Sequence, residues 1–110
     1  MLSQTEGKII HDLKSRLTEI AGDRLQSVIV YSSRVWGKPD LESDLDVAVI
    51  IHDSDPQLKA DLLEAAYQVM WDYDFSPLIS LTVIDSQSFA AYLEKGFSFY
   101  RKVAQEGIAL

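Results

Sequence analysis

Apolar residues recur along the chain at two spacings, one typical of helices and one typical of buried strands. In residues 4–21 the side chains of Ile9, Leu13 and Leu17 return every fourth position with polar residues between them, which predicts an amphipathic helix that ends at Gly22. The same spacing and the polar residues that flank it predict three more helices, at residues 57–72, 85–93 and 97–107.

Shorter runs of β-branched and apolar residues predict three strands, at residues 25–31, 44–51 and 75–84. About a dozen residues, 32–43, join the first two strands, which allows either a long hairpin or a crossover connection. Pro77, near the start of the third predicted strand, is typical of an edge strand or a bulge. The order of elements, with helices between strands, predicts one α/β or α+β domain with a small sheet over residues 1–110.

The charge of the chain narrows the class of partner. Seventeen acidic and ten basic residues give a formal net charge of −7, which repels the backbone of a nucleic acid. A nucleoside triphosphate that arrives with a divalent cation is still compatible, because the cation supplies the complementary charge. There is no cysteine, no apolar run as long as a membrane span and no signal peptide at the start, so we expect a cytoplasmic protein without membrane contact or disulfides.

The second predicted strand begins with two acidic residues, Asp44 and Asp46, separated only by Leu45. Because strand side chains alternate between faces, both carboxylates are expected on one face with Cβ atoms roughly 6–7 Å apart, and Leu45 is expected in a core. Both carboxylates then reach one magnesium ion at about 2.1 Å. Without a cation they repel, and the pKa of at least one is expected to rise. A bare Asp-x-Asp also occurs at solvent-exposed strand starts, so this spacing alone does not define a metal site.

The residues before the pair give the spacing a context. The stretch SSRVWGKPDLESDLD, residues 32–46, resembles the signature of the DNA polymerase beta-type nucleotidyltransferase superfamily, in which glycine-serine, ten residues and Asp-x-Asp follow one another. Ser32 stands at the glycine, Ser33 at the serine, and Asp44 and Asp46 at the paired aspartates. The chain is most similar to the small stand-alone bacterial and archaeal domains of that superfamily, and the similarity extends with less specificity to the last predicted helix.

The resemblance implies a nucleotidyltransferase fold, which is a small mixed sheet flanked by helices on one side. It also implies the use of ATP and Mg²⁺ or Mn²⁺. It implies that Asp44 and Asp46 bind the metal and act in catalysis together with a third carboxylate near the third strand. Asp74 is the first choice for that carboxylate, and Asp72 and Asp85 are the alternatives. The residues implied in nucleotide contacts are Ser32, Ser33, Arg34, Lys38 and Ser43. The implied reaction transfers AMP from ATP to a hydroxyl, and domains of this type are often the antitoxin-like halves of two-protein systems with a small helical partner of the HEPN class.

Departures from the signature keep a second interpretation open. Ser32 replaces the glycine, Trp36 stands where an arginine is usual, and the middle of the third predicted strand contains no acid. The alternative function is therefore a catalytically degenerate module that binds a partner protein or dimerises. A homo-oligomer is compatible with both interpretations.

Overall fold

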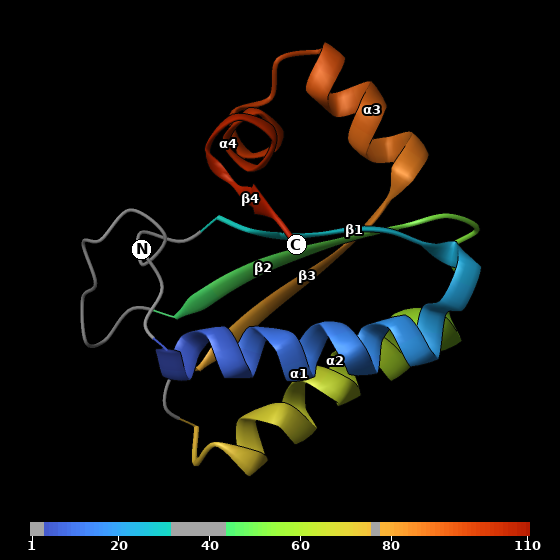
Figure 1. The fold of residues 1–110 in the computed structure, drawn as a ribbon. Helices are drawn as coiled ribbons and strands as arrows, with labels where there is room; N and C mark the ends of the chain where they lie inside the picture. The colour runs from blue at the N-terminus through green and yellow to red at the C-terminus, as the bar shows by residue number, and fades with distance from the viewer. Residues whose placement is uncertain (1–3, 32–43, 76–77) are drawn as a thin grey trace.

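The computed structural model describes residues 4–31, 44–75 and 78–110. The predicted class is confirmed, since a small mixed sheet is flanked by helices (Figure 1). The elements follow in the order α1 (Gln4–Ala21), the 3-10 helix η1 (Gly22–Arg24), β1 (Leu25–Val30), β2 (Leu45–Ile51), α2 (Pro56–Asp72), β3 (Ile79–Asp85), α3 (Ser86–Glu94), α4 (Ser98–Glu106) and β4 (Ile108–Ala109).

The sheet has the strand order β3-β2-β1-β4. β1 and β2 pair antiparallel, with Val30 opposite Val47, so the connection that the sequence left open is a hairpin and not a crossover. β2 and β3 run parallel and are connected through α2, as parallel neighbours require. β4 pairs antiparallel with β1 on the side away from β2.

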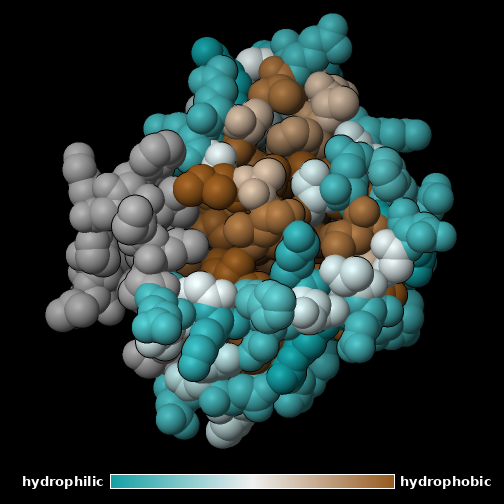
Figure 2. Space-filling model, viewed as in Figure 1, coloured by the Kyte–Doolittle hydropathy of each residue, from teal (hydrophilic) through white to brown (hydrophobic). Residues whose placement is uncertain are grey.

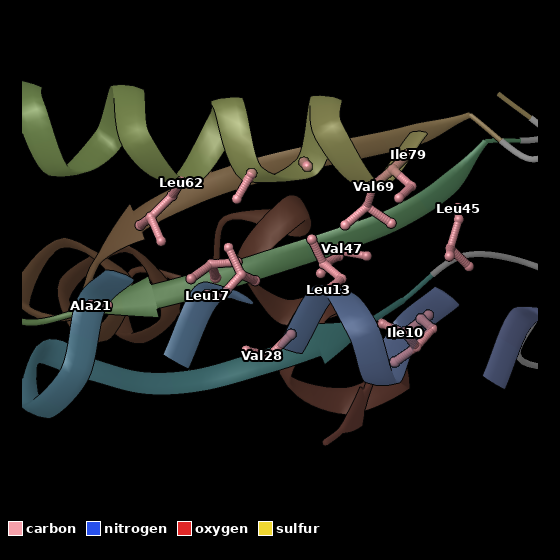
Figure 3. Close-up of a cluster of buried hydrophobic side chains, with 14 of the residues drawn as sticks. Ile10, Leu13, Leu17, Ala21, Val28, Leu45, Val47, Leu62, Val69 and Ile79 are labelled. Carbon is pink, nitrogen blue, oxygen red and sulfur yellow. The ribbon is translucent and has the colours of Figure 1, made fainter. Parts of the chain in front are cut away.

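The larger core lies between one face of the sheet and the helices α1 and α2 (Figure 3). Leu13 and Leu17 from α1 and Leu62 from α2 are fully buried there against the side chains of β2. At about 25 cal/mol per Å² of apolar surface, these contacts are the main favourable term for a domain of this size. α2 begins where the Asp55 carboxylate accepts a hydrogen bond from the Leu58 N–H at 2.7 Å, which fixes the first turn beside the core.

The opposite face of the sheet carries a second, smaller core. Ala48 and Ile50 of β2 and Ile84 of β3 are buried there together with Val103 of α4. The expectation that helices cover one side only is therefore wrong, because α3 and α4 pack on the face that α1 and α2 leave open (Figure 1). Apolar residues also gather on the surface between α1 and α4, near β4 (Figure 2).

Two boundaries differ from the predictions. The third strand does not begin at Phe75, because Asp74 and Phe75 have φ values of 56° and 57°, a left-handed backbone that a strand does not adopt. The strand begins at Ile79, and Pro77 lies outside the described residues. The last helix ends at Glu106, and the chain then forms β4, which the sequence did not predict.

Candidate functional site

The start of β2 separates its side chains between the two faces of the sheet. Leu45 and Val47 are fully buried in the larger core, as predicted. Asp46 lies between them on the other face and is half-buried. Asp44 immediately precedes the strand and is exposed. One carboxylate of the pair therefore belongs to the sheet surface, and the other stands at its solvent edge.

The carboxyl group of Asp46 is held in an unfavourable environment. Burial raises the pKa of Asp46, the nearby charge of Asp44 raises it further, and Lys102 of α4 lowers it in part. The predicted repulsion within the pair is thus present in the fold. A cation between the two carboxylates would relieve both causes of the raised pKa, because it compensates for the lost hydration and for the like charge.

Tyr31 connects the end of β1 to this site. Its backbone N–H donates to the Asp46 carbonyl at 3.1 Å, so the chain leaves β1 directly beside Asp46. The Tyr31 side chain is buried, lies edge-on to the Phe99 ring at 5.8 Å and is hydrogen-bonded to Thr82. Burial, and secondarily the charge of Asp46, raise the pKa of the Tyr31 phenol, which the hydrogen bond from Thr82 lowers. Tyr31, the last described residue before Asp44, therefore lies beside Asp46.

The three candidates for a third carboxylate are not drawn together with the pair. Asp74 is exposed in the turn after α2, where its N–H donates to the Trp71 carbonyl at 3.3 Å. Asp72, at the end of α2, forms an ion pair with Arg16. Within residues 4–31, 44–75 and 78–110, no group of three or more acidic or histidine side chains is arranged to hold a metal ion.

The register of the sheet explains why Asp85 lies far from the pair. Asp46 pairs with Ser80, and Asp85 stands five residues further along β3, about 16 Å away at the rise of a strand. Its carboxylate caps α3 instead, accepting from the N–H groups of Gln87 and Ser88 at 3.1 and 3.3 Å. The strand positions that share a face with Asp46 are Ser80 and Thr82, which are hydroxyl residues.

Five residues implied in nucleotide contacts lie outside the described residues, namely Ser32, Ser33, Arg34, Lys38 and Ser43. Their roles stay predictions. The structure adds Tyr31 and Lys102 to the neighbourhood of Asp46, and the sequence did not single out either. Lys102 follows Phe99 by three positions in a predicted helix, but the spacing gives no sign of which sheet face that helix covers.

The chain matches no protein-family model, no curated protein and no solved structure at a significant level. The fold defines the structural class of the protein, which is a small α+β domain with a mixed four-stranded sheet. None of the described helices combines the length and the apolar character needed to cross a bilayer.

Proposed function

We propose that the protein is a divalent-metal-dependent nucleotidyltransferase that transfers AMP from ATP to a hydroxyl group, with a partner protein as the acceptor. The observation that carries the proposal is the half-buried Asp46, with the charge of Asp44 close enough to raise its pKa. Placing a like charge beside a partly desolvated carboxylate destabilises a fold unless a positive group binds there. Magnesium between the two aspartates supplies that group, as the resemblance of residues 32–46 implies.

The proposed chemistry assigns distinct tasks to the residues of the site. Asp44 and Asp46 would hold the metal, which neutralises the charge that develops on the phosphoryl oxygens. The acceptor hydroxyl oxygen bonds to the α-phosphorus and releases its proton to solvent, the bond to the bridging oxygen of the β-phosphate breaks, and pyrophosphate leaves. Tyr31 supports the proposal because its backbone N–H donates to the Asp46 carbonyl, so the last described residue before the signature lies beside this aspartate.

Calorimetric titration with ATP, in the presence and absence of magnesium, tests the nucleotide site. We expect binding that requires magnesium and that weakens at least about tenfold in the Asp44→Asn/Asp46→Asn variant, because the metal then loses both anionic ligands. The matched control is Asp23→Asn/Asp61→Asn, which removes the same charge from two exposed positions on η1 and α2 and should bind ATP as the native chain does. Equal binding by the native chain and the first variant would refute the site.

The degenerate binding module remains the second candidate, and the hydroxyl residues Ser80 and Thr82 opposite the start of β2 favour it. Such a module would bind a partner protein without transferring AMP, and it need not bind magnesium and ATP. Intact-mass spectrometry of a small helical HEPN-class partner, incubated with the chain and magnesium-ATP, separates the two functions. An added AMP that disappears with Asp46→Asn supports the transferase, whereas binding without any mass change supports the module.

A further inference from the structure

The strand β3 forms an edge of the sheet whose one charged residue, Asp85, stands at its last position. Among the described residues it pairs only with β2, and no strand lies along its other side. Residues 78–84 read LISLTVI and contain no charged residue. Proteins usually protect an edge strand with charged side chains, proline or a bulge, since its free N–H and C=O groups pair readily with another chain.

The hydrogen bonds at the start of β3 show which groups point outward. The Leu78 carbonyl accepts from the Leu45 N–H of β2 at 2.8 Å, so even-numbered residues of β3 direct their backbone groups toward β2. The odd-numbered residues direct theirs away, and the N–H of Ile79 donates to the Met70 sulfur of α2 at 3.2 Å. Leu81 and Val83 are the next odd-numbered residues of β3, so their N–H and C=O groups also point toward the free edge.

Next to this edge, α2 exposes a row of large apolar side chains that we call the α2 outer face: Leu63, Tyr67 and Trp71. They are 45%, 44% and 57% exposed and recur every fourth residue, so they form one stripe. The Tyr67 and Trp71 rings contact each other edge-on at 6.1 Å, and Phe75 extends the cluster at 5.0 Å from Trp71.

The stripe faces the β3 side of the molecule. α2 contacts β3, and α1 contacts β1, at opposite sides of the sheet. The side of α2 nearest α1 is occupied by the ion pair of Asp72 with Arg16 and by a groove of about 370 Å³ that Gln68 and Glu64 help to line. The α2 outer face points away from that side, and Met70, which neighbours Leu63 and Tyr67 on the helix surface, accepts a hydrogen bond from the outward-directed Ile79 N–H of β3.

The geometry points to a symmetric dimer in which β3 pairs antiparallel with β3 of a second copy and the two α2 outer faces pack against each other. A two-fold axis at the edge places β3 beside β3 of the second copy and the α2 outer face against the α2 outer face of that copy. Most homodimers have a self-complementary interface of this kind. The two four-stranded sheets then join into one continuous sheet, and the Leu81 and Val83 backbone groups gain partners. This dimer does not depend on the proposed nucleotide site.

The available area fits a weak dimer. A fully buried aromatic side chain contributes about 150–250 Å², so the half-exposed residues of the stripe offer roughly 300 Å² per copy. The edge of seven residues is about 23 Å long at the rise of a strand and adds roughly 200 Å² per copy. The interface would bury about 1,000 Å² in total, which is the lower bound for specific association. A net charge of −7 on each copy opposes association, and salt screens this repulsion.

Sedimentation equilibrium of the full chain over a wide range of loading concentrations tests the dimer. We expect a transition from one to two chain masses that shifts to lower concentration as salt is added. Trp71→Lys should raise the dissociation constant at least about tenfold, because it places two ammonium groups in an apolar contact. The matched control is Gln68→Lys, which adds the same charge to the other side of α2 and should leave the dissociation constant near the native value or lower it.

Leu81→Pro tests the strand pairing itself. It removes an N–H that points away from β2, so the variant is expected to keep its fold and to be monomeric. Hydrogen exchange adds a readout that requires no substitution, since the Leu81 and Val83 amides should be protected at concentrations where the dimer forms and should exchange rapidly on dilution. A native chain that stays monomeric at every concentration and salt level overturns the proposal. So does a dimer that persists in Trp71→Lys and exchanges Leu81 as fast as the monomer.

Discussion

At the scale of single residues, Asp46 shows a conflict between folding and the proposed site. Its backbone carbonyl stabilises the end of β1 by accepting from the Tyr31 N–H, whereas its carboxyl group is partly desolvated and repelled by Asp44. An asparagine would keep the backbone bond and much of the shape and would remove the charge. The burial and the charge of Asp44 therefore favour asparagine at this position, the charge of Lys102 offsets them in part, and a bound cation would favour aspartate.

The Asp46→Asn variant should be more stable than the native chain at neutral pH when no divalent cation is present. In the fold the pKa of Asp46 is raised above its ordinary value of 3.8, so the folded state binds the proton more tightly than the unfolded state. The contribution of Asp46 to the stability of the native chain therefore falls as pH rises from about that value through the raised pKa, and it is level above. Thermal unfolding from pH 3 to pH 7 should show the two proteins converging at the acid end and separating above it.

Asp44→Asn provides the control for this prediction. It removes the second cause of the raised pKa but leaves the burial, so its gain in stability at neutral pH should be smaller than that of Asp46→Asn. Magnesium should stabilise the native chain and not Asp46→Asn, because a ligand stabilises only the state that binds it. A native chain whose stability rises steadily from pH 4 to pH 7, while Asp46→Asn stays level, would contradict the assignment.

At the scale of elements, long periodic segments were predictable and pairing partners were not. The stripes of α1 and α2 extend over four or more turns, and both helices agree with their predicted bounds to within a residue. The two residues of β4 are too short to show a period, and its pairing with β1 depends on where α4 ends. The aspartate pair could be predicted from the sequence. The position of a third carboxylate could not, because the register of β3 against β2 decides which side chain of β3 lies beside Asp46.

Two glycines on different elements should respond to alanine in opposite directions. Gly7 is exposed within α1 and a Cβ there meets no atom within 4 Å, so Gly7→Ala should stabilise the fold by about 0.5–1 kcal/mol through the unfolded chain's entropy. Gly107 joins α4 to β4, and a Cβ there would contact the Ile29 side chain and lie 2.6 Å from the Val103 carbonyl. Gly107→Ala should destabilise the fold by about 1–3 kcal/mol.

Urea unfolding measures both glycine variants against the native chain. A loss of stability for Gly7→Ala would mean that the first turns of α1 are not helical in solution. An unchanged midpoint for Gly107→Ala would mean that the junction of α4 and β4 does not lie against Ile29 and the Val103 carbonyl as described.

At the scale of the whole molecule, the sheet separates two cores of unequal size. The core under α1 and α2 contains most of the buried side chains, including Leu13 and Leu62, which are fully buried. The core under α3 and α4 is a small cluster, and Val103 is the one α4 residue that is buried in it. α3 has no buried residue. The C-terminal layer should therefore open before the rest of the domain does.

Native-state hydrogen exchange should resolve the two layers. We expect amides of α3 and α4 to exchange through a local opening, at a lower free energy than those of α1 and α2, which require global unfolding. Leu13→Ala should lower the free energy of global unfolding by about 2–5 kcal/mol, whereas Val103→Ala should mainly lower the free energy of the local opening. Equal protection across all four helices would show one cooperative unit instead of two.

The position of α4 over the face that carries Asp46 couples these two properties of the molecule. When α4 lifts from the sheet, Asp46 regains hydration, which favours its ionised form, and loses the charge of Lys102, which opposes it. Because burial is the larger of the two effects on the pKa of Asp46, the carboxyl group ionises more readily. Docking of α3 and α4 on the sheet therefore opposes the ionisation of Asp46. A ligand that binds the ionised carboxylate opposes this docking by the same coupling free energy. A ligand bound at the aspartates would change how often α4 opens. A protein that binds the outer surface of α4 would in turn change the affinity of the aspartates for that ligand.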